Sequence, residues 1–175
     1  MAGRGELFAL ALILVMPLAG CGWEPLYADP QSGPSSEELR AIRVGPIADR
    51  IGQQLEMALR NSLNPTGEPT KYRYSLNTVL RVALSNLGIQ SQGTATLGRL
   101  DVYATSVLVD NHGATLLTNS LHVQNSFALN PNQYSTVVGE DDAQIRSVAE
   151  LNQEIVARLN LFMQNREAHP SPKPG

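Results

Sequence analysis

The chain has 175 residues, of which 42% are hydrophobic, 17% are charged and 5% are aromatic, and its formal net charge is −3. This balance argues against nucleic acid as the main partner, because domains that bind nucleic acid are basic. The single cysteine leaves no pair for a disulfide within the chain, so its thiol needs another explanation.

The first segment of the chain has the layout of a secretory signal. Arg4 gives a positive start, residues 7–18 are apolar and uncharged, and small residues precede Cys21. An apolar stretch of this length is shorter than the roughly 20 residues that span a bilayer as a helix. We therefore expect residues 1–20 to be a signal peptide that is cleaved between Gly20 and Cys21.

The cleavage site itself, residues 18–21 (Leu-Ala-Gly-Cys), resembles the bacterial lipobox. In that motif the thiol receives a diacylglycerol and the new amine is then acylated, for example with palmitate. Two or more acyl chains hold a protein stably on a membrane. Gly22 stands where an Asp would resemble the inner-membrane retention signal, which favours the outer membrane. The alternatives are an ordinary secretory signal that contains a cysteine, and a buried apolar helix.

Removal of residues 1–20 from the 175 leaves 155 residues, enough for one domain with a core. Residues 21–38 are rich in Pro, Gly and Ser, which predicts a lipidated N-terminus and a flexible tether. Residues 39–166 are expected to form the domain. Residues 167–175 contain three prolines near the C-terminus, which is typical of a disordered tail.

The domain begins with a short predicted strand at residues 39–44. Asp49 is expected to cap a helix that ends at Asn64. The predicted apolar face of that helix consists of Ile51, Leu55, Ala58, Leu59 and Ser62. From Tyr72 to Leu84 the apolar residues recur every second position, which indicates a long strand with one buried face.

Two more long strands are predicted, at about residues 94–109 and 114–129, with a tight turn at residues 110–113 (Asp-Asn-His-Gly) between them. Residues 130–135 are expected to form a loop, and residues 140–164 a long helix. Glu140, Asp141 and Asp142 suit the positive end of that helix. Its predicted buried stripe is Ile145, Val148, Leu151, Asn152, Ile155, Leu159 and Phe162.

The resulting order, β-α-β-β-β-α, predicts an α+β fold. Both helices must bury an apolar face, and each long strand offers one. We therefore expect the two helices to pack on one face of a four-stranded mixed sheet, with the first β-α-β unit parallel and the later strands antiparallel. The other face of the sheet is predicted to be polar.

Catalytic and metal-binding patterns are absent from the sequence. His112, His122 and His169 fall in a turn, a strand and the tail, and none lies at metal-ligand spacing. The mature chain has no phosphate-binding loop and no nucleophile elbow. We predict no catalytic residues, no metal and no cofactor.

Basic residues are the more informative group. Lys71, Arg73, Arg81 and Arg99 lie on or beside the first two long strands, with the three arginines on the predicted polar face. Because guanidinium groups match phosphate geometry, Arg73, Arg81 and Arg99 are candidate ligands for an anionic glycolipid such as lipopolysaccharide. The alternative is that they are ordinary solvated charges.

Several segments together resemble the family of lipopolysaccharide-assembly lipoproteins (LptE), most closely its alphaproteobacterial branch. They are residues 21–27 (Cys-Gly-Trp-Glu-Pro-Leu-Tyr), 47–55 with 63–65, 87–90 leading into 94–96, and 134–143. The resemblance covers nearly all of the mature chain and agrees with the predicted element order. It does not assign Arg73, Arg81 or Arg99, which remain candidates by their chemistry.

The resemblance implies a structural and binding role without catalysis. Members of the family act as a plug in the lumen of a large outer-membrane β-barrel (LptD type), help that barrel to fold, and assist placement of lipopolysaccharide in the outer leaflet. Two alternatives stay open: an auxiliary lipoprotein of an ABC-type lipid transporter, and a lipid-anchored hydrolase.

Overall fold

The computed structural model describes residues 34–89 and 95–168, which lie within one compact unit, Gly33–Gly175. Gly20, Cys21, the rest of the predicted signal and tether up to residue 33, and the tail from His169 onward lie outside the described residues. The described elements are α2 (Pro34–Arg40), β1 (Ile42–Val44), α3 (Arg50–Leu63), β2 (Tyr74–Ile89), β3 (Ala95–Asp110), β4 (Thr115–Ala128) and α4 (Gln133–Ala168). Apart from α2, this order confirms the predicted fold class.

The sheet has four strands in the order β1-β2-β3-β4. Strand β1 is parallel to β2, and the other two pairs are antiparallel, as the sequence predicted. The tight turn between β3 and β4 is also confirmed. Asp110 Oδ1 accepts hydrogen bonds from the backbone N–H groups of His112 (2.9 Å) and Ala114 (2.8 Å). Gly113 has a φ of 84°, a backbone conformation that is strained for residues with a β-carbon.

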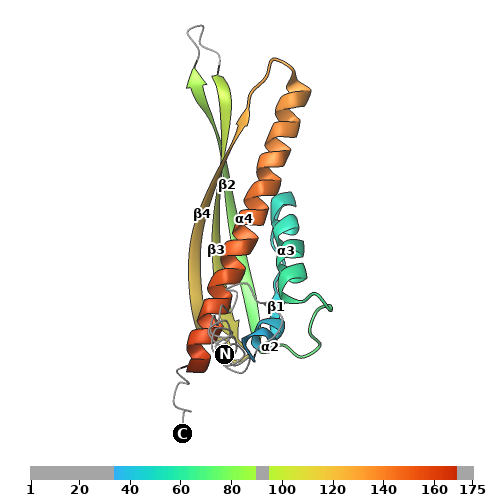
Figure 1. Cartoon of the computed structure of the whole chain (residues 1–175), viewed down its shortest axis with the longest axis vertical. Helices are drawn as coiled ribbons and strands as arrows, with labels where there is room; N and C mark the ends of the chain where they lie inside the picture. Colours follow the sequence, from blue (N-terminus) through green and yellow to red (C-terminus); the bar gives the residue numbers. More distant parts are fainter. Residues whose placement is uncertain (1–33, 90–94, 169–175) are drawn as a thin grey trace, which may run out of the picture. The chain divides into compact units, whose positions relative to one another are not determined.

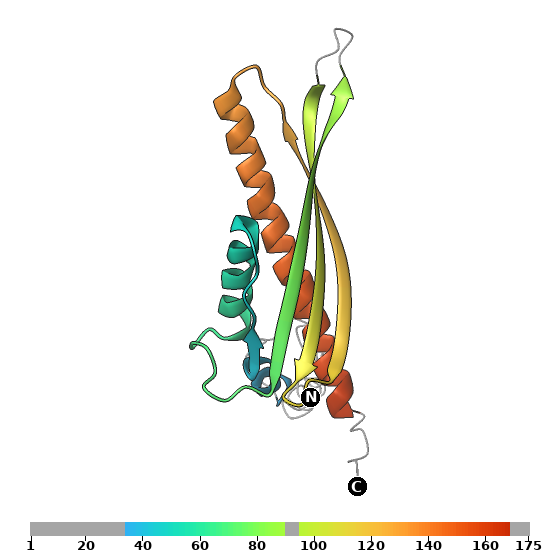
Figure 2. The ribbon, with the colours of Figure 1, turned by 180° about the vertical axis from the view of Figure 1, so that it is seen from behind.

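Helices α3 and α4 lie on the same side of the sheet (Figures 1 and 2). The core forms between them and the sheet. Its largest fully buried side chains are Ile42, Val44, Leu55, Leu59, Leu63, Leu76, Leu100, Leu108, Leu151, Ile155, Leu159 and Met163. None of the described helices combines the length and the apolar composition that crossing a membrane requires.

The buried stripe of α4 differs from the prediction at its N-terminal half. Ile145 is 54% exposed, whereas Ala143 and Ser147 are fully buried. Small residues at these positions let the helix approach the sheet closely, and the Ser147 hydroxyl donates to the Ala143 carbonyl (2.8 Å). In α3, likewise, Leu63 takes the buried place expected for Ser62, which is exposed and bonded to Asn152.

Two helical segments were not predicted from the sequence pattern: helix α2 and the first turns of α4. Leu39, predicted to begin a strand, lies in α2, and β1 begins at Ile42. Helix α4 begins at Gln133 instead of about residue 140, because Asn132 Oδ1 accepts the Tyr134 backbone N–H (3.0 Å) and so starts the helix earlier.

Two predicted interactions at helix N-termini, one for α4 and one for α3, are wrong. Asp141 and Asp142 lie inside α4, where they pair with Arg50 and Arg146. Asp49 precedes α3 with φ 67°, but its side chain makes no capping hydrogen bond. Instead, the Glu56 carboxylate accepts the Ile47 backbone N–H (3.0 Å) from within the helix.

Candidate functional site on the outer face of the sheet

The sheet face turned away from α3 and α4 is here called the outer face, and no helix within residues 34–89 and 95–168 covers it (Figure 2). Side chains alternate between the two faces of a strand, and the strand register decides which of them become neighbours. Arg81 lies opposite Tyr103, which lies opposite His122. The adjacent row contains Asp101. The predicted outward placement of Arg81 is confirmed by this register, and Asp101 and Tyr103 lie on the same face.

Asp101 is the centre of this arrangement. It is only 7% exposed although it points to the outer face. One carboxylate oxygen lies 2.9 Å from His122 Nε2, and the other accepts the Arg99 Nε–H (2.9 Å). A carboxylate removed from water needs such partners on both oxygens. We call Arg81, Arg99, Asp101, Tyr103 and His122 the outer-face cluster.

The aromatic part of the cluster is a flat stack. The rings of Tyr103 and His122 lie 4.3 Å apart between centroids, with 5° between their planes. Tyr103 is 47% exposed, so one aromatic surface faces solvent. Stacking on His122 and the hydrogen bond from His122 to Asp101 hold both rings in place, which presents a rigid surface to a ligand.

The charge of the cluster favours an anion. The guanidinium groups of Arg81 and Arg99 outnumber the single carboxylate of Asp101, which leaves a local charge of about +1 with neutral histidine. Arg81 is exposed and has no ion pair within the part of the chain that the structure describes. Its donors are therefore available to a phosphate or carboxylate.

The three arginines predicted from the sequence do not form a single site. Arg81 and Arg99 share the cluster, although Arg99 is held by Asp101. Arg73 pairs with Glu38 of α2 and precedes Arg81 by eight positions, which corresponds to about 26 Å along a strand. Any joint ligand of all three would have to extend along most of β2.

Tyr74, next to Arg73, belongs to the same distant group. Its hydroxyl donates to Glu38 Oε2 (2.8 Å), and the Arg166 guanidinium lies over its ring. Burial and this bond to Glu38 raise the pKa of Tyr74. Glu38, Arg73 and Arg166 therefore join α2, β2 and the end of α4, which is a structural role.

Sequence reasoning missed the contribution of His122. Only the register of β3 against β4 brings it to Asp101 and Tyr103, and a spacing of about twenty residues gives no local signal for that. Among the described side chains, no hydroxyl or thiol forms a hydrogen bond with His122, whose Nε2 lies 2.9 Å from Asp101. His112 lies in the β3–β4 turn.

Metal binding finds no support in the same region. Within residues 34–89 and 95–168, no group of at least three His, Cys, Asp or Glu side chains could hold a metal ion. The cluster has one carboxylate and one imidazole, both already engaged with each other.

Comparison with solved structures places the fold among bacterial lipoproteins. A protein named as a candidate lipoprotein of Caulobacter crescentus CB15 matches 74% of this chain and 96% of its own, with a TM-score of 0.61 and 18% identity. Lipoprotein B of Nitrosomonas europaea, described as uncharacterized, matches 73% of this chain and 86% of its own (TM-score 0.53, 16% identity). A minor lipoprotein of Acinetobacter baumannii matches 71% of this chain and 91% of its own (TM-score 0.52, 17% identity).

Sequence comparison adds nothing to this. No protein-family model matches the chain, and no curated protein matches it. At these identities the likeness to solved structures is one of fold.

Proposed function

We propose that this chain is a lipid-anchored protein of the bacterial outer membrane that works with a large β-barrel of the LptD type to place lipopolysaccharide in the outer leaflet. In this proposal Cys21 carries the acyl chains, and the domain lies on the periplasmic side, as a plug in the barrel lumen. The protein has no catalytic role. Its contribution is to support the barrel and to contact lipopolysaccharide.

The observation that carries the proposal is the agreement of two independent features. The sequence Leu-Ala-Gly-Cys ends at Cys21, the only cysteine, and the domain has the fold of the Caulobacter protein named as a candidate lipoprotein, of which it covers 96%. One feature concerns the anchor and the other the folded domain. Both features support the proposal of a lipoprotein.

A lipopolysaccharide contact is supported by the outer-face cluster. Lipopolysaccharide offers phosphates and sugars, and the cluster offers the exposed guanidinium of Arg81 beside the exposed ring of Tyr103. A phosphate would bind the Arg81 donors, and a sugar ring would lie against the aromatic stack. We place Arg81 first among the three candidates, since Arg73 and Arg99 already pair with Glu38 and Asp101.

Co-purification from detergent-solubilised outer membrane tests the proposal. The intact chain should recover a large β-barrel protein, and a Cys21→Ser variant should be lost from the membrane fraction and incorporate no labelled palmitate. Recovery of an inner-membrane ATPase complex instead would favour the auxiliary lipoprotein of an ABC-type transporter. A hydrolytic turnover that disappears in His122→Ala would favour the hydrolase.

A further inference from the structure

Among the described residues, strand β4 forms one edge of the sheet, because it is last in the strand order and pairs with β3 alone. Soluble proteins usually protect such an edge with lysine, proline, a bulge or a charged side chain. The 14 residues of β4 (TLLTNSLHVQNSFA) include none of these residue types. The register irregularity lies at Leu108 and Val109, near the start of β4, and the Arg146 guanidinium of α4 donates to the Ser126 carbonyl near its end (3.2 Å). The uncovered stretch of the edge therefore lies between these two points.

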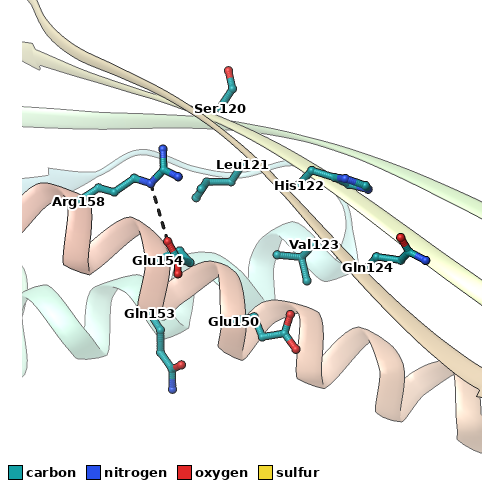
Figure 3. A pocket seen from close by; sticks show the side chains of 9 residues that line it. All are labelled: Ser120, Leu121, His122, Val123, Gln124, Glu150, Gln153, Glu154 and Arg158. Atoms are coloured by element: carbon teal, nitrogen blue, oxygen red, sulfur yellow. Dashed lines mark ion pairs between the residues drawn. The ribbon is translucent and has the colours of Figure 1, made fainter.

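A hollow lies beside the middle of this edge. It has a volume of about 440 Å³, and it is lined by residues 120–124 of β4 and by Glu150, Gln153, Glu154 and Arg158 of α4. Figure 3 shows Leu121 and Val123 pointing toward α4, with Ser120 pointing away. The five strand residues extend over about 16 Å, and a further strand would lie about 4.8 Å from them.

The charges on the helical side of the hollow are acidic. Glu150 is exposed and forms no ion pair with the described residues. Glu154 is 58% exposed, and its ion pair with Arg158 Nε is long, at 3.8 Å. Two carboxylates against one guanidinium leave about −1 there. An occupant that carries basic side chains on this side is favoured over an acidic one.

We propose that the free edge of β4 accepts an extended basic segment of a partner protein as an additional antiparallel or parallel strand, with a basic side chain against Glu150 and Glu154. The backbone N–H and C=O groups of the edge supply the affinity, and the acidic helix face supplies the selectivity. This inference stands apart from the proposed function: it concerns the opposite side of β4 from the β3 partner and does not require lipopolysaccharide.

A peptide probe tests the proposal on the full chain in detergent. The probe is the blocked peptide Thr-Lys-Val-Lys-Thr-Lys-Val-Lys-Thr, compared with the same peptide carrying Glu for Lys and with one carrying N-methyl groups on alternate backbone nitrogens. We expect the lysine peptide to slow hydrogen exchange of the backbone amides in residues 120–124. The glutamate and N-methylated peptides should bind at least about tenfold more weakly.

Protein variants identify the acidic contacts. Glu150→Gln with Glu154→Gln should weaken binding of the lysine peptide about fivefold, as expected for two exposed ion pairs. Glu37→Gln with Glu68→Gln removes the same charge elsewhere and should leave binding unchanged. The proposal is wrong if the N-methylated peptide binds as well as its parent, if protection appears on β2 instead, or if a second copy of the chain occupies β4 in sedimentation experiments.

Discussion

Asp110 organises the β3–β4 turn through its side chain, because its Oδ1 accepts hydrogen bonds from the backbone of both His112 and Ala114. These donors favour the ionised carboxylate and lower the pKa of Asp110. Replacement by alanine removes both acceptors while Gly113 still provides the left-handed turn conformation. We expect Asp110→Ala to lower the melting temperature at pH 7, measured by circular dichroism, and Asn111→Ala to leave it nearly unchanged.

The same residue gives a pH dependence with a defined sign. Because the folded chain holds the Asp110 pKa below its ordinary 3.8, the unfolded chain takes up the proton first as the pH falls. The stability that Asp110 contributes is therefore present above pH 3.8 and is lost below it. The difference in melting temperature between the wild type and Asp110→Ala should narrow below that pH. A constant difference down to pH 2.5 would contradict this account.

Gly98 has no space for a side chain, because its cross-strand partner Phe127 lies over it. A β-carbon at this position would meet the phenyl ring, with Cε2 at 2.7 Å and Cε1 at 2.8 Å. Phe127 is itself 6% exposed, so its ring has little freedom to move. Gly98→Ala should reduce the free energy of unfolding by about 1–3 kcal/mol, measured by urea denaturation.

A double-mutant cycle distinguishes this clash from a general effect of alanine in a strand. Phe127→Leu alone removes buried area, but in the Gly98→Ala background it should cost less than in the wild type, since the smaller side chain relieves the contact. If the two changes add, the contact with Phe127 is not the cause.

At the scale of elements, α3 depends on close approach of its first turn to the preceding loop. A β-carbon on Gly52 would lie 2.7 Å from Ile47 Cγ2 and 3.1 Å from the Ile47 carbonyl carbon. The second contact is with backbone, which a rotamer change cannot relieve. We expect Gly52→Ala to cost about 1–3 kcal/mol in urea unfolding, although alanine favours helix.

The neighbouring Gln53 supplies the matched control for this substitution. It is exposed in the same turn, so Gln53→Ala should change stability by less than about 0.5 kcal/mol. A stabilising Gly52→Ala would mean that helix propensity outweighs the clash and that the loop can move away.

How far the sequence predicts each element depends on how regular its pattern is. The three long strands alternate cleanly, so β2, β3 and β4 were predicted nearly as observed. The predicted buried face of β2 is confirmed only in its first half, because Val82 and Leu84 are 47% and 53% exposed. The short helix α2 was not, because Leu39 offers too little periodicity to separate helix from strand. The start of α4 depends on a single Asn132 cap, whereas the acidic residues farther along suggested a later beginning.

The candidate site was less predictable for a related reason. Alternation places Arg81 and Arg99 on one face, but it does not give the distance between them. The pairing of β2 with β3 separates Arg99 from Arg81 by two rows, and the pairing of β3 with β4 brings His122 to Asp101. The strand pattern also does not predict that Arg99 and His122 bury the Asp101 carboxylate. The acylation site Cys21 stays a prediction, because it lies outside the described residues.

At the scale of the whole domain, the two faces of the sheet differ in composition: one forms the core, and the other contains the outer-face cluster. The face toward α3 and α4 contains the core, in which Leu108 is 0% exposed. The outer face contains a buried carboxylate, a stacked aromatic pair and an arginine, Arg81, that forms no ion pair with the residues the structure describes. Stability should therefore depend on the first face and ligand binding on the second.

Leu108→Ala and Arg81→Ala, compared in parallel, test this division. Leu108→Ala creates a cavity and should cost about 2–5 kcal/mol in urea unfolding, yet the folded fraction should bind lipopolysaccharide in detergent as the wild type does. Arg81→Ala should change stability by less than about 0.5 kcal/mol but weaken lipopolysaccharide binding about tenfold, since a charge-assisted contact to phosphate is lost. Arg43→Ala, which removes an exposed arginine paired with Glu68, controls for net charge. If Arg43→Ala and Arg81→Ala weaken binding equally, the ligand responds to overall charge and the outer-face cluster is not its site.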